Sequence, residues 1–218
     1  MKAIFERIED YEHIIWDWNG TLLDDVEICL TVLQQTLTAH GITPPNLEDY
    51  RAQFHFPVKS YYESLGIDFS DLDFEKMSDE FVAHHLKNTL ENGKLFDGTI
   101  EILEHIAQNH AEQSVLSAAH QKYLEHFLKH FEIHHLFDRI FGLSDNMATC
   151  KKERGLALIS ESKIEREQTI LIGDTDHDLE VAKNLGIDAL IIADGHQCFQ
   201  RLSKLHHNVI ESRFEILK

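Results

Sequence analysis

The sequence predicts an α/β fold in which a parallel β-sheet is flanked by helices and carries an inserted helical segment. Two observations support this prediction. Short apolar runs, bounded by Gly, Ser or Asp, are typical of buried parallel strands, and helical patterns separate most of them. In addition, the stretch 25–92, between the first and second runs, has a weak strand signal and is too long for a plain crossover.

The expected core alternates strands with helices, which implies right-handed crossovers between parallel strands. The tail Asn208–Lys218 includes Val209 and Ile210 and predicts an edge strand. The expected strands are His13–Asp17, Ser114–Ser117, Arg139–Leu143, Thr169–Gly173 and Ala189–Ala193. The expected core helices are Ile100–Asn109, His120–His130, Gly155–Ser162 and Asp178–Leu185.

Helical patterns fill the stretch 25–92, and the pairs Pro44-Pro45 and Phe56-Pro57 separate them. We therefore expect a helical cap domain over residues 25–92, inserted into a core domain formed by 1–24 and 93–218. The expected cap helices are Val26–His40, Leu47–Phe54, Val58–Leu65 and Phe74–Leu90.

The composition indicates a folded chain and narrows its partners. Hydrophobic residues make up 43% of the 218 residues, which allows a sizeable core. The formal net charge of −18 argues against nucleic-acid binding, which relies on clustered Lys and Arg, and against binding to anionic membranes. A small anionic substrate is compatible with this charge, because a bound divalent cation reverses the local field.

Cysteine usage and the amino terminus bear on the compartment. Cys29, Cys150 and Cys198 lie far apart and form no CxxC pattern, which favours a reducing compartment over a disulfide framework. The first residues are charged throughout and lack the apolar region of a signal peptide. No run approaches the roughly 20 apolar residues that a membrane span needs. We therefore expect a soluble cytoplasmic protein.

The run Ile14–Asp24 is the most informative stretch. An apolar strand ends at Asp17, and Gly20-Thr21 turns the chain at once, so Asp17 is expected at the carboxyl end of a strand, where open α/β sheets hold ligands. The spacing Asp-x-Asn-Gly-Thr resembles the first motif of the haloacid dehalogenase superfamily. There the leading Asp is a nucleophile that is transiently phosphorylated, whereas the family's usual residue at position 19 is Asp rather than Asn.

A second apolar strand ends in Gly173-Asp174, and Asp178 follows four residues later. If the turn after this strand resembles that of the family, Asp174 and Asp178 point toward Asp17 on the neighbouring strand. Carboxylates that close repel one another unless a cation neutralises them. A hard divalent cation suits oxygen ligands, and Mg²⁺ uses one or two carboxylates and keeps several waters. The resemblance adds the main-chain carbonyl of Asn19 as a further metal ligand.

Two further positions match the family. Ser117, at the end of its strand, matches the Ser or Thr that hydrogen-bonds a phosphate oxygen, and its neighbour Ala118 is expected beside the substrate. A lysine that precedes the helix at Gly155 would neutralise the nucleophile and the bound phosphate. Lys151 and Lys152 are both candidates, and the pattern Cys-Lys-x-Glu-Arg-Gly favours Lys151.

The four motifs occur in order along nearly the whole chain, which is similar to the phosphoglycolate-phosphatase-like branch of the superfamily. The resemblance implies a Rossmann-like core with a helical cap, and a Mg²⁺-dependent phosphatase. Its substrate would be a small phosphomonoester, phosphoglycolate-like or another phosphorylated metabolite, hydrolysed through an aspartyl-phosphate on Asp17. Ser117, Lys151 and the amides near Thr21 would hold the phosphate oxygens. The protein is expected to be a monomer or a homodimer.

Asn19 leaves several readings open. In most relatives the Asp at this position protonates the leaving alcohol and deprotonates the water, and such help is worth ~10²–10⁴-fold in rate. The enzyme is then slow on alkyl phosphates, uses an acyl or aryl phosphate whose leaving group needs no proton, or relies on another residue, such as a cap residue or His177. The alternative is a catalytically impaired module that binds phosphate and Mg²⁺ without turnover.

Other readings of the sequence are weaker. A dehalogenase needs no acidic cluster after its last strand, so Asp174 and Asp178 argue against dehalogenase activity. A phosphonatase needs a cap lysine that forms a Schiff base, and nothing in the sequence marks such a lysine. Most of the 16 histidines, including the adjacent pair His84-His85, are expected to be surface or satisfied histidines rather than metal ligands, whereas His196 follows a strand end and is open to a substrate-facing role. Asp24 and Asp25 are expected to begin the hinge into the cap.

Overall fold

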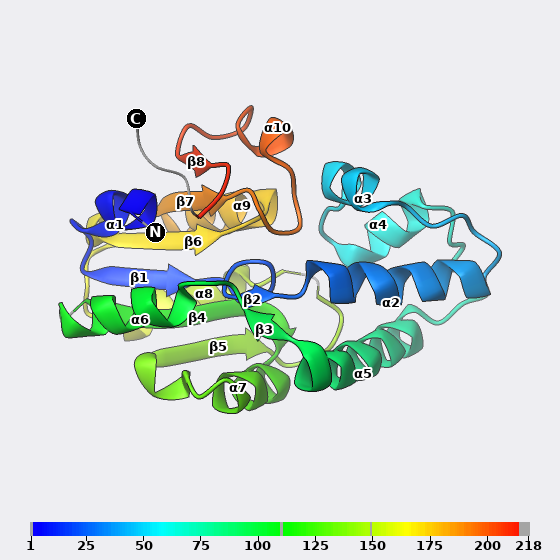
Figure 1. Cartoon of the computed structure of the whole chain (residues 1–218), viewed down its shortest axis with the longest axis horizontal. Coiled ribbons are helices and arrows are strands. Elements are labelled where there is room, and N and C mark those ends of the chain that lie inside the picture. Colours follow the sequence, from blue (N-terminus) through cyan, green and yellow to red (C-terminus); the bar gives the residue numbers. More distant parts are fainter. Residues whose placement is uncertain (1, 110, 149, 214–218) are drawn as a thin grey trace.

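The computed structural model describes residues 2–109, 111–148 and 150–213 (Figure 1). Its centre is a six-stranded sheet in the order β5-β4-β1-β6-β7-β8, and all neighbouring strands run parallel. This confirms the predicted α/β class. The strands are β1 His13–Trp16, β4 Glu112–His120, β5 Arg139–Leu143, β6 Thr169–Gly173, β7 Asp188–Ile192 and β8 Val209–Ile210.

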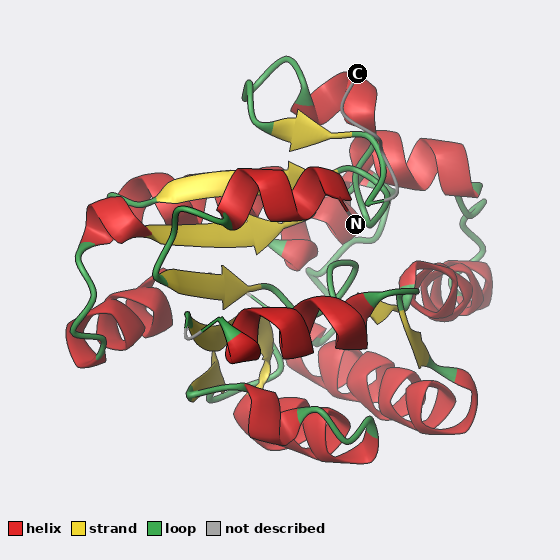
Figure 2. Ribbon diagram, turned by 60° about the vertical axis from the view of Figure 1, so that its left-hand side comes forward, coloured by secondary structure: helices red, strands yellow, loops and turns green. Residues whose placement is uncertain are grey.

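Helices cover both faces of this sheet (Figure 2). Successive residues of β1 point to opposite faces, so Ile14 and Trp16 join one apolar cluster and Ile15 joins the other. A strand covered on both faces needs apolar residues at every position, which explains its unbroken apolar run. The helices α1 Lys2–Ile8, α6 Thr99–Gln108 and α7 Gln121–His130 supply residues to the first cluster, and α8 Lys152–Glu161 and α9 Asp176–Leu185 to the second.

The helical insertion has an apolar core of its own. In α2, the buried residues Val26, Leu30, Leu33 and Leu37 recur every three or four positions and therefore share one face of the helix. Aromatic residues from the other helices of the insertion pack against that face. The helices are α2 Val26–Ala39, α3 Leu47–Gln53, α4 Val58–Ser64 and α5 Phe74–Asn92, close to their expected bounds.

Two short strands, absent from the sequence-based prediction, join the insertion to the sheet. β2 Leu23–Asp24 leads into α2, and β3 Lys94–Leu95 follows α5; the two pair antiparallel. The chain therefore leaves the core and returns to it through adjacent strands. A two-residue strand is too short for any alternation of apolar and polar residues to reveal it.

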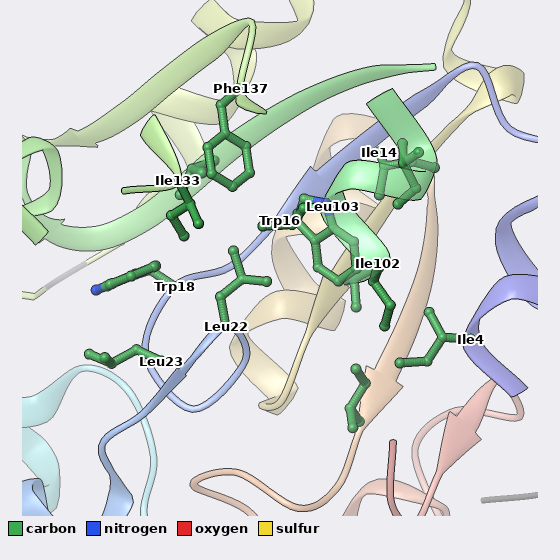
Figure 3. Packing of buried hydrophobic residues seen from close by; sticks show 14 of the residues in the cluster. Ile4, Ile14, Trp16, Trp18, Leu22, Leu23, Ile102, Leu103, Ile133 and Phe137 are labelled. Carbon is green, nitrogen blue, oxygen red and sulfur yellow. The ribbon is translucent and has the colours of Figure 1, made fainter. Parts of the chain in front are cut away.

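The structure also differs from the prediction near the two ends of the chain. The segment Lys2–Ile8 forms α1, and its residues Ile4 and Ile8, one helical turn apart, are buried in the apolar cluster on one face of the sheet. Figure 3 shows Ile4 in this cluster. In the sequence, the charged residues around Ile4 and Ile8 made this apolar i, i+4 pair hard to recognise as a helix. Near the other end, a short helix, α10 Phe199–Leu202, precedes β8, which lies inside the predicted edge strand. The rest of that prediction, beyond Arg213, lies outside the described residues.

No helix among the described residues combines the length and the apolar character needed to cross a membrane.

We expect His13 to make the protein sensitive to acid. Its ring is fully buried, 2.9 Å from Ser114 Oγ, and burial lowers the pKa of His13 to about 4 from an ordinary value of 6.5. Between these pH values the unfolded chain binds a proton that the folded protein does not, so stability falls as pH falls from 6.5 to about 4. The loss reaches at most about 3 kcal/mol.

Urea unfolding of wild type and His13→Gln at pH 7 and pH 5 measures this contribution. The variant should lose less stability than wild type when the pH is lowered. Equal losses in the two proteins would mean that His13 is not responsible.

Candidate active site

Three aspartates meet at the carboxyl edge of the sheet. Asp17 follows β1 and Asp174 follows β6, and these strands are neighbours, with the Asp17 N–H donating to Ile172 O at 2.8 Å. Asp178 reaches the same point from the first turn of α9. The three residues are at most 8% exposed, and each offers a side-chain oxygen within 4.8 Å of the others. The predicted acidic cluster is therefore assembled in the fold.

Lys151 brings a cation to this cluster. Its Nζ atom lies 2.5 Å from Asp17 Oδ1 and 2.7 Å from Asp178 Oδ1, and it donates to Leu116 O at 2.9 Å. Burial disfavours the ammonium, but the two carboxylates outweigh burial and hold the pKa of Lys151 well above its ordinary value. Lys152 forms no ion pair within the described part of the chain, so the geometry favours Lys151 of the two candidates.

The cluster holds more negative charge than Lys151 balances. Burial raises the pKa of Asp17 to about 6 and that of Asp174 to about 8, whereas Lys151 outweighs burial at Asp178 and lowers its pKa. Protonation of Asp174 is one response to crowding, and a divalent cation is another. The donor set consists of carboxylate oxygens, which hard cations prefer, so these residues fit Mg²⁺.

The backbone encloses Asp174 closely. A Cβ atom on Gly20 would lie 2.3 Å from Asp174 Oδ2, and one on Gly195 would lie 2.2 Å from it. Gly20 also has φ +70, a conformation that favours glycine. Both positions therefore need glycine for the carboxylate to fit, which explains why Gly20 follows the Asp17 strand so closely.

Asp178 is fixed by the start of its helix. Its Oδ2 atom accepts hydrogen bonds from the N–H groups of Asp174 and Thr175 and from Thr175 Oγ1. This is a capping box, in which Thr175 and Asp178 satisfy the free donors of the first turn. Oδ1 remains directed at Lys151. The sequence therefore uses one carboxylate both to start α9 and to place the lysine.

The remaining predicted residues divide into two groups. Ser117 and Ala118, on β4, line a cavity together with Asp17, and Ser117 Oγ accepts from Ala119 N–H at 3.0 Å. Thr21 lies behind the cluster instead. Its hydroxyl donates to Asp174 Oδ1 at 3.2 Å and its N–H to Trp18 O at 3.3 Å, so both groups support the turn and Asp174.

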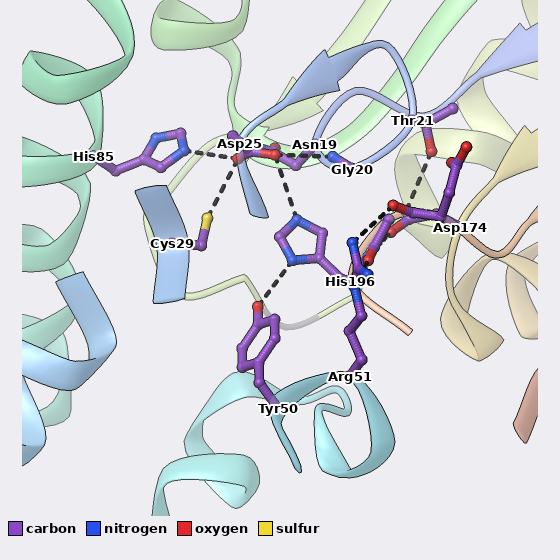
Figure 4. A network of polar contacts seen from close by, with 12 residues as sticks. Asn19, Gly20, Thr21, Asp25, Cys29, Tyr50, Arg51, His85, Asp174 and His196 are labelled. Atoms are coloured by element: carbon purple, nitrogen blue, oxygen red, sulfur yellow. Dashed lines mark hydrogen bonds and ion pairs between the residues drawn. The ribbon is translucent and has the colours of Figure 1, made fainter. Parts of the chain in front are cut away.

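Asn19 joins a polar network that sequence reasoning missed (Figure 4). Its Nδ2 atom donates to Asp25 Oδ2 at 2.6 Å, and Asp25 is fully buried. His85 Nε2, from α5, lies 2.8 Å from the same oxygen, and His196 Nε2 lies 3.4 Å from Asp25 Oδ1. Although burial opposes ionisation, these histidines hold the pKa of Asp25 well below its ordinary value. Tyr50 completes the network through a 2.8 Å contact with His196 Nδ1.

Part of this network left a signal in the sequence. Met77, Ser78, His85 and Thr89 are buried on α5 at helical spacing, so His85 lies on the inward face of its helix. The sequence analysis set His84-His85 aside as surface or satisfied histidines, because two neighbouring helical residues do not face one site, and so it gave His85 no role. Asp25 carries no comparable signal, because its partners come from distant segments.

The helical insertion and the sheet edge meet over a partly open cavity of about 170 Å³. Asp17, Ser117 and Lys151 line it from the sheet edge, and aromatic residues line it from the cap. The loop after β7 ties the two parts together, since Arg51 of α3 donates to the carbonyl oxygens of Asp194 and Gly195. A ligand in this cavity therefore contacts the nucleophile candidate and the cap at once.

This chain is similar to several known proteins. A 5'-nucleotidase of Pseudomonas aeruginosa is 26% identical over 85% of this chain and 84% of its own length, and a phosphoglycolate phosphatase of Rhodobacter capsulatus is 22% identical over 84% and 85%. A solved haloacid dehalogenase-like hydrolase from Streptococcus pneumoniae has the same fold, with a TM-score of 0.78 at 23% identity over 93% of this chain and 94% of that one. The model of the haloacid dehalogenase-like hydrolase family matches residues 14–192. The chain therefore belongs to the haloacid dehalogenase-like hydrolase family.

Proposed function

We propose that this protein is a Mg²⁺-dependent phosphatase that hydrolyses a small phosphomonoester through an aspartyl-phosphate on Asp17. The observation that carries the proposal is the buried cluster in which Asp17 lies 2.5 Å from Lys151 and shares a site with Asp174 and Asp178. The names of the relatives support the reaction class, since they include a phosphoglycolate phosphatase and a 5'-nucleotidase.

The first step forms the covalent intermediate. An oxygen of the ionised Asp17 carboxylate attacks phosphorus in line, and the bond from phosphorus to the ester oxygen breaks. The leaving oxygen departs with the electron pair and takes a proton from a nearby donor or from solvent. Lys151 faces the attacking carboxylate and is placed to balance charge on the phosphoryl group, and Ser117 lines the same space.

The second step restores the enzyme. Water attacks the phosphorus of the aspartyl-phosphate, the bond from phosphorus to the Asp17 oxygen breaks, and the water proton leaves for solvent or a nearby base. Inorganic phosphate and the Asp17 carboxylate result. Mg²⁺, held by Asp17, Asp174, Asp178 and the Asn19 carbonyl, would neutralise phosphate charge and orient the phosphoryl group in both steps.

The test is release of inorganic phosphate from a panel of phosphate esters, measured with Mg²⁺ and with EDTA. The proposal expects release that EDTA abolishes and that added Mg²⁺ restores. Trapping the intermediate with hydroxylamine, which cleaves acyl phosphates, identifies the covalent step. Binding of Mg²⁺ without release from any ester would instead support the non-catalytic alternative.

We expect Mg²⁺ to stabilise the folded protein, because the metal relieves repulsion among buried carboxylates. A ligand present at 100 times its dissociation constant stabilises by about 2.7 kcal/mol. Thermal unfolding should therefore shift upward in Mg²⁺ relative to EDTA. Asp174→Asn keeps the shape of the side chain but removes a ligand, and should lose most of the shift. An equal shift in Asp174→Asn would place the metal elsewhere.

The contact between Asn19 and Asp25 allows a direct test of whether the lack of a general acid at position 19 limits the reaction. A single Asn19→Asp change would set two carboxylates at the 2.6 Å separation now spanned by the amide and Asp25. The double variant Asn19→Asp/Asp25→Asn exchanges the two groups and preserves the hydrogen bond in the reverse direction. We expect it to raise kcat/KM for alkyl phosphates by at least ~10²-fold, the lower end of what a positioned acid supplies.

Asp25→Asn alone is the matched control, because it lacks the new carboxylate at position 19. Acetyl phosphate is the matched substrate, since its leaving group needs little protonation. Alkyl-phosphate rates that stay unchanged in the double variant would show that a proton at position 19 does not limit the reaction.

A further inference from the structure

The cavity above Asp17 is built to hold an uncharged group. Most of its lining atoms belong to aromatic and aliphatic side chains of the cap and of α7. They include Phe56, Phe81, Val82, Leu86 and Phe127. Sites of this kind bind the apolar part of a ligand, while a few polar groups fix its orientation. Here Asp17 and Lys151 are among those polar groups.

Lysine and arginine side chains are scarce in the cavity lining. Among the described residues that line the cavity, Lys151 is the single Lys or Arg, and it is already paired with Asp17 and Asp178. Three of the lining histidines already have partners: His85 and His196 face Asp25, and His120 Nδ1 accepts from Lys122 N–H. The fourth, His177, stacks on Phe56, and its buried Nε2 has no hydrogen-bond partner among the described residues. A carboxylate on the leaving group, as in phosphoglycolate, would be buried without a free Lys or Arg to pair with, which is costly.

The position that would protonate the leaving group is also occupied. The Asn19 side chain cannot release a proton, and its amide is held by Asp25. Asp25 accepts in addition from Gly20 N–H and Cys29 Sγ, so its carboxylate is fully engaged as an acceptor (Figure 4). His196 uses both ring nitrogens within the network, toward Asp25 and Tyr50. The network thus fixes Asn19 and offers no free acid beside it.

From these two features we infer that the substrate is a phosphate monoester of an uncharged aromatic alcohol, whose ring occupies the cavity and whose oxygen leaves as a phenolate. This inference rests on the proposed phosphatase activity and names its substrate class. A phenol such as tyrosine ionises near pKa 10, about six units below water, so it leaves without a general acid where an aliphatic alcohol does not.

The size of the cavity agrees with a single ring. An apolar cavity of roughly 150 Å³ in another protein holds benzene, and this cavity measures about 170 Å³. The phosphate of such an ester reaches Asp17, Ser117 and Lys151 while the ring contacts the cap. In the covalent step the ester P–O bond breaks, Asp17 gains the phosphoryl group, and the phenolate takes its proton from solvent after departure.

Four substrates test the two parts of the inference independently: the aromatic ring in the cavity and the leaving group that needs no proton. Phenyl phosphate has the ring and the good leaving group, benzyl phosphate has the ring alone, acetyl phosphate has the good leaving group alone, and phosphoglycolate has neither. We expect kcat/KM for phenyl phosphate to exceed that for benzyl phosphate by at least ~10²-fold, the share of rate that a general acid normally supplies. Phenyl phosphate should also have a KM at least tenfold below that of acetyl phosphate.

A cavity variant tests the location of the ring. Val82 is half-buried, lines the cavity and belongs to none of the apolar core clusters, whereas the next residue of α5, Ala83, is exposed. Val82→Trp narrows the cavity and should raise the KM for phenyl phosphate at least tenfold. Ala83→Trp adds the same side chain outside the cavity and should leave this KM unchanged. A cooperative thermal unfolding transition close to that of wild type shows that each variant is folded.

The outcomes distinguish failure of this inference from failure of the proposed function. Phosphate release from phosphoglycolate or benzyl phosphate at the rate of phenyl phosphate overturns the inference and leaves the phosphatase intact. If benzyl phosphate is fast and His177→Phe slows it selectively, His177 supplies the proton, and the leaving group need not be a phenol. Release from none of the four substrates, with Mg²⁺ bound, overturns the proposed function itself.

Discussion

Asp17→Asn is expected to abolish turnover, with kcat reduced by at least about 10⁴-fold. An amide oxygen is a poor nucleophile, and the acyl phosphate cannot form on it. The fold should survive the change, because Asn has the same shape and Lys151 keeps Asp178 as its partner at 2.7 Å. Burial already raises the pKa of Asp17 to about 6, so its removal also relieves charge crowding. Thermal stability without Mg²⁺ should therefore not fall.

Asp24→Asn is the matched control for this variant. Asp24 belongs to the same stretch of sequence but forms a partly exposed ion pair with Lys94 at 3.1 Å, away from the cluster. Phosphate release and hydroxylamine trapping should be lost in Asp17→Asn and retained in Asp24→Asn. A folded Asp17→Asn protein that still releases phosphate at a substantial rate would exclude Asp17 as the nucleophile.

The core of the fold was predictable because its strands are buried on both faces. Residues Ile14, Ile15 and Trp16 contact opposite helical layers in turn, so the apolar run has no polar gap and stands out from the sequence. The bounds of the cap helices were predictable for a related reason, since α2 repeats its apolar residues at helical spacing. Elements held by few residues, such as β2 and β3, leave no pattern of that kind.

The acidic cluster was predictable because it depends on strand ends. Asp17 and Asp174 each end an apolar run, and parallel neighbours bring such ends together. The network around Asn19 depends instead on how the cap sits on the core. Asp25, His85 and His196 meet only after α2, α5 and the loop after β7 are in place, and no local pattern encodes that placement. Sequence reasoning therefore located the acidic cluster but missed what holds Asn19.

Lys151→Met is expected to impair both stability and catalysis. Lys151 is 2% exposed and is the partner of two buried carboxylates, and Met fills similar space without the charge. Removing one side of a buried ion pair typically costs about 3–5 kcal/mol, because the remaining charge is left without compensation. Loss of a preorganised charge at the phosphoryl group should also lower kcat by ~10²–10³-fold.

Lys152→Met provides the comparison, because it removes the same charge one residue away, at the first position of α8. Urea unfolding without Mg²⁺ should show a large loss of stability for Lys151→Met and a small one for Lys152→Met. Mg²⁺ should recover part of the stability of Lys151→Met, since it neutralises the same carboxylates, but kcat should stay low because the metal does not occupy the position of Nζ. If Lys152→Met has the larger effect on kcat, the phosphate-binding role belongs to Lys152, and the 2.5 Å contact between Lys151 and Asp17 serves the fold alone.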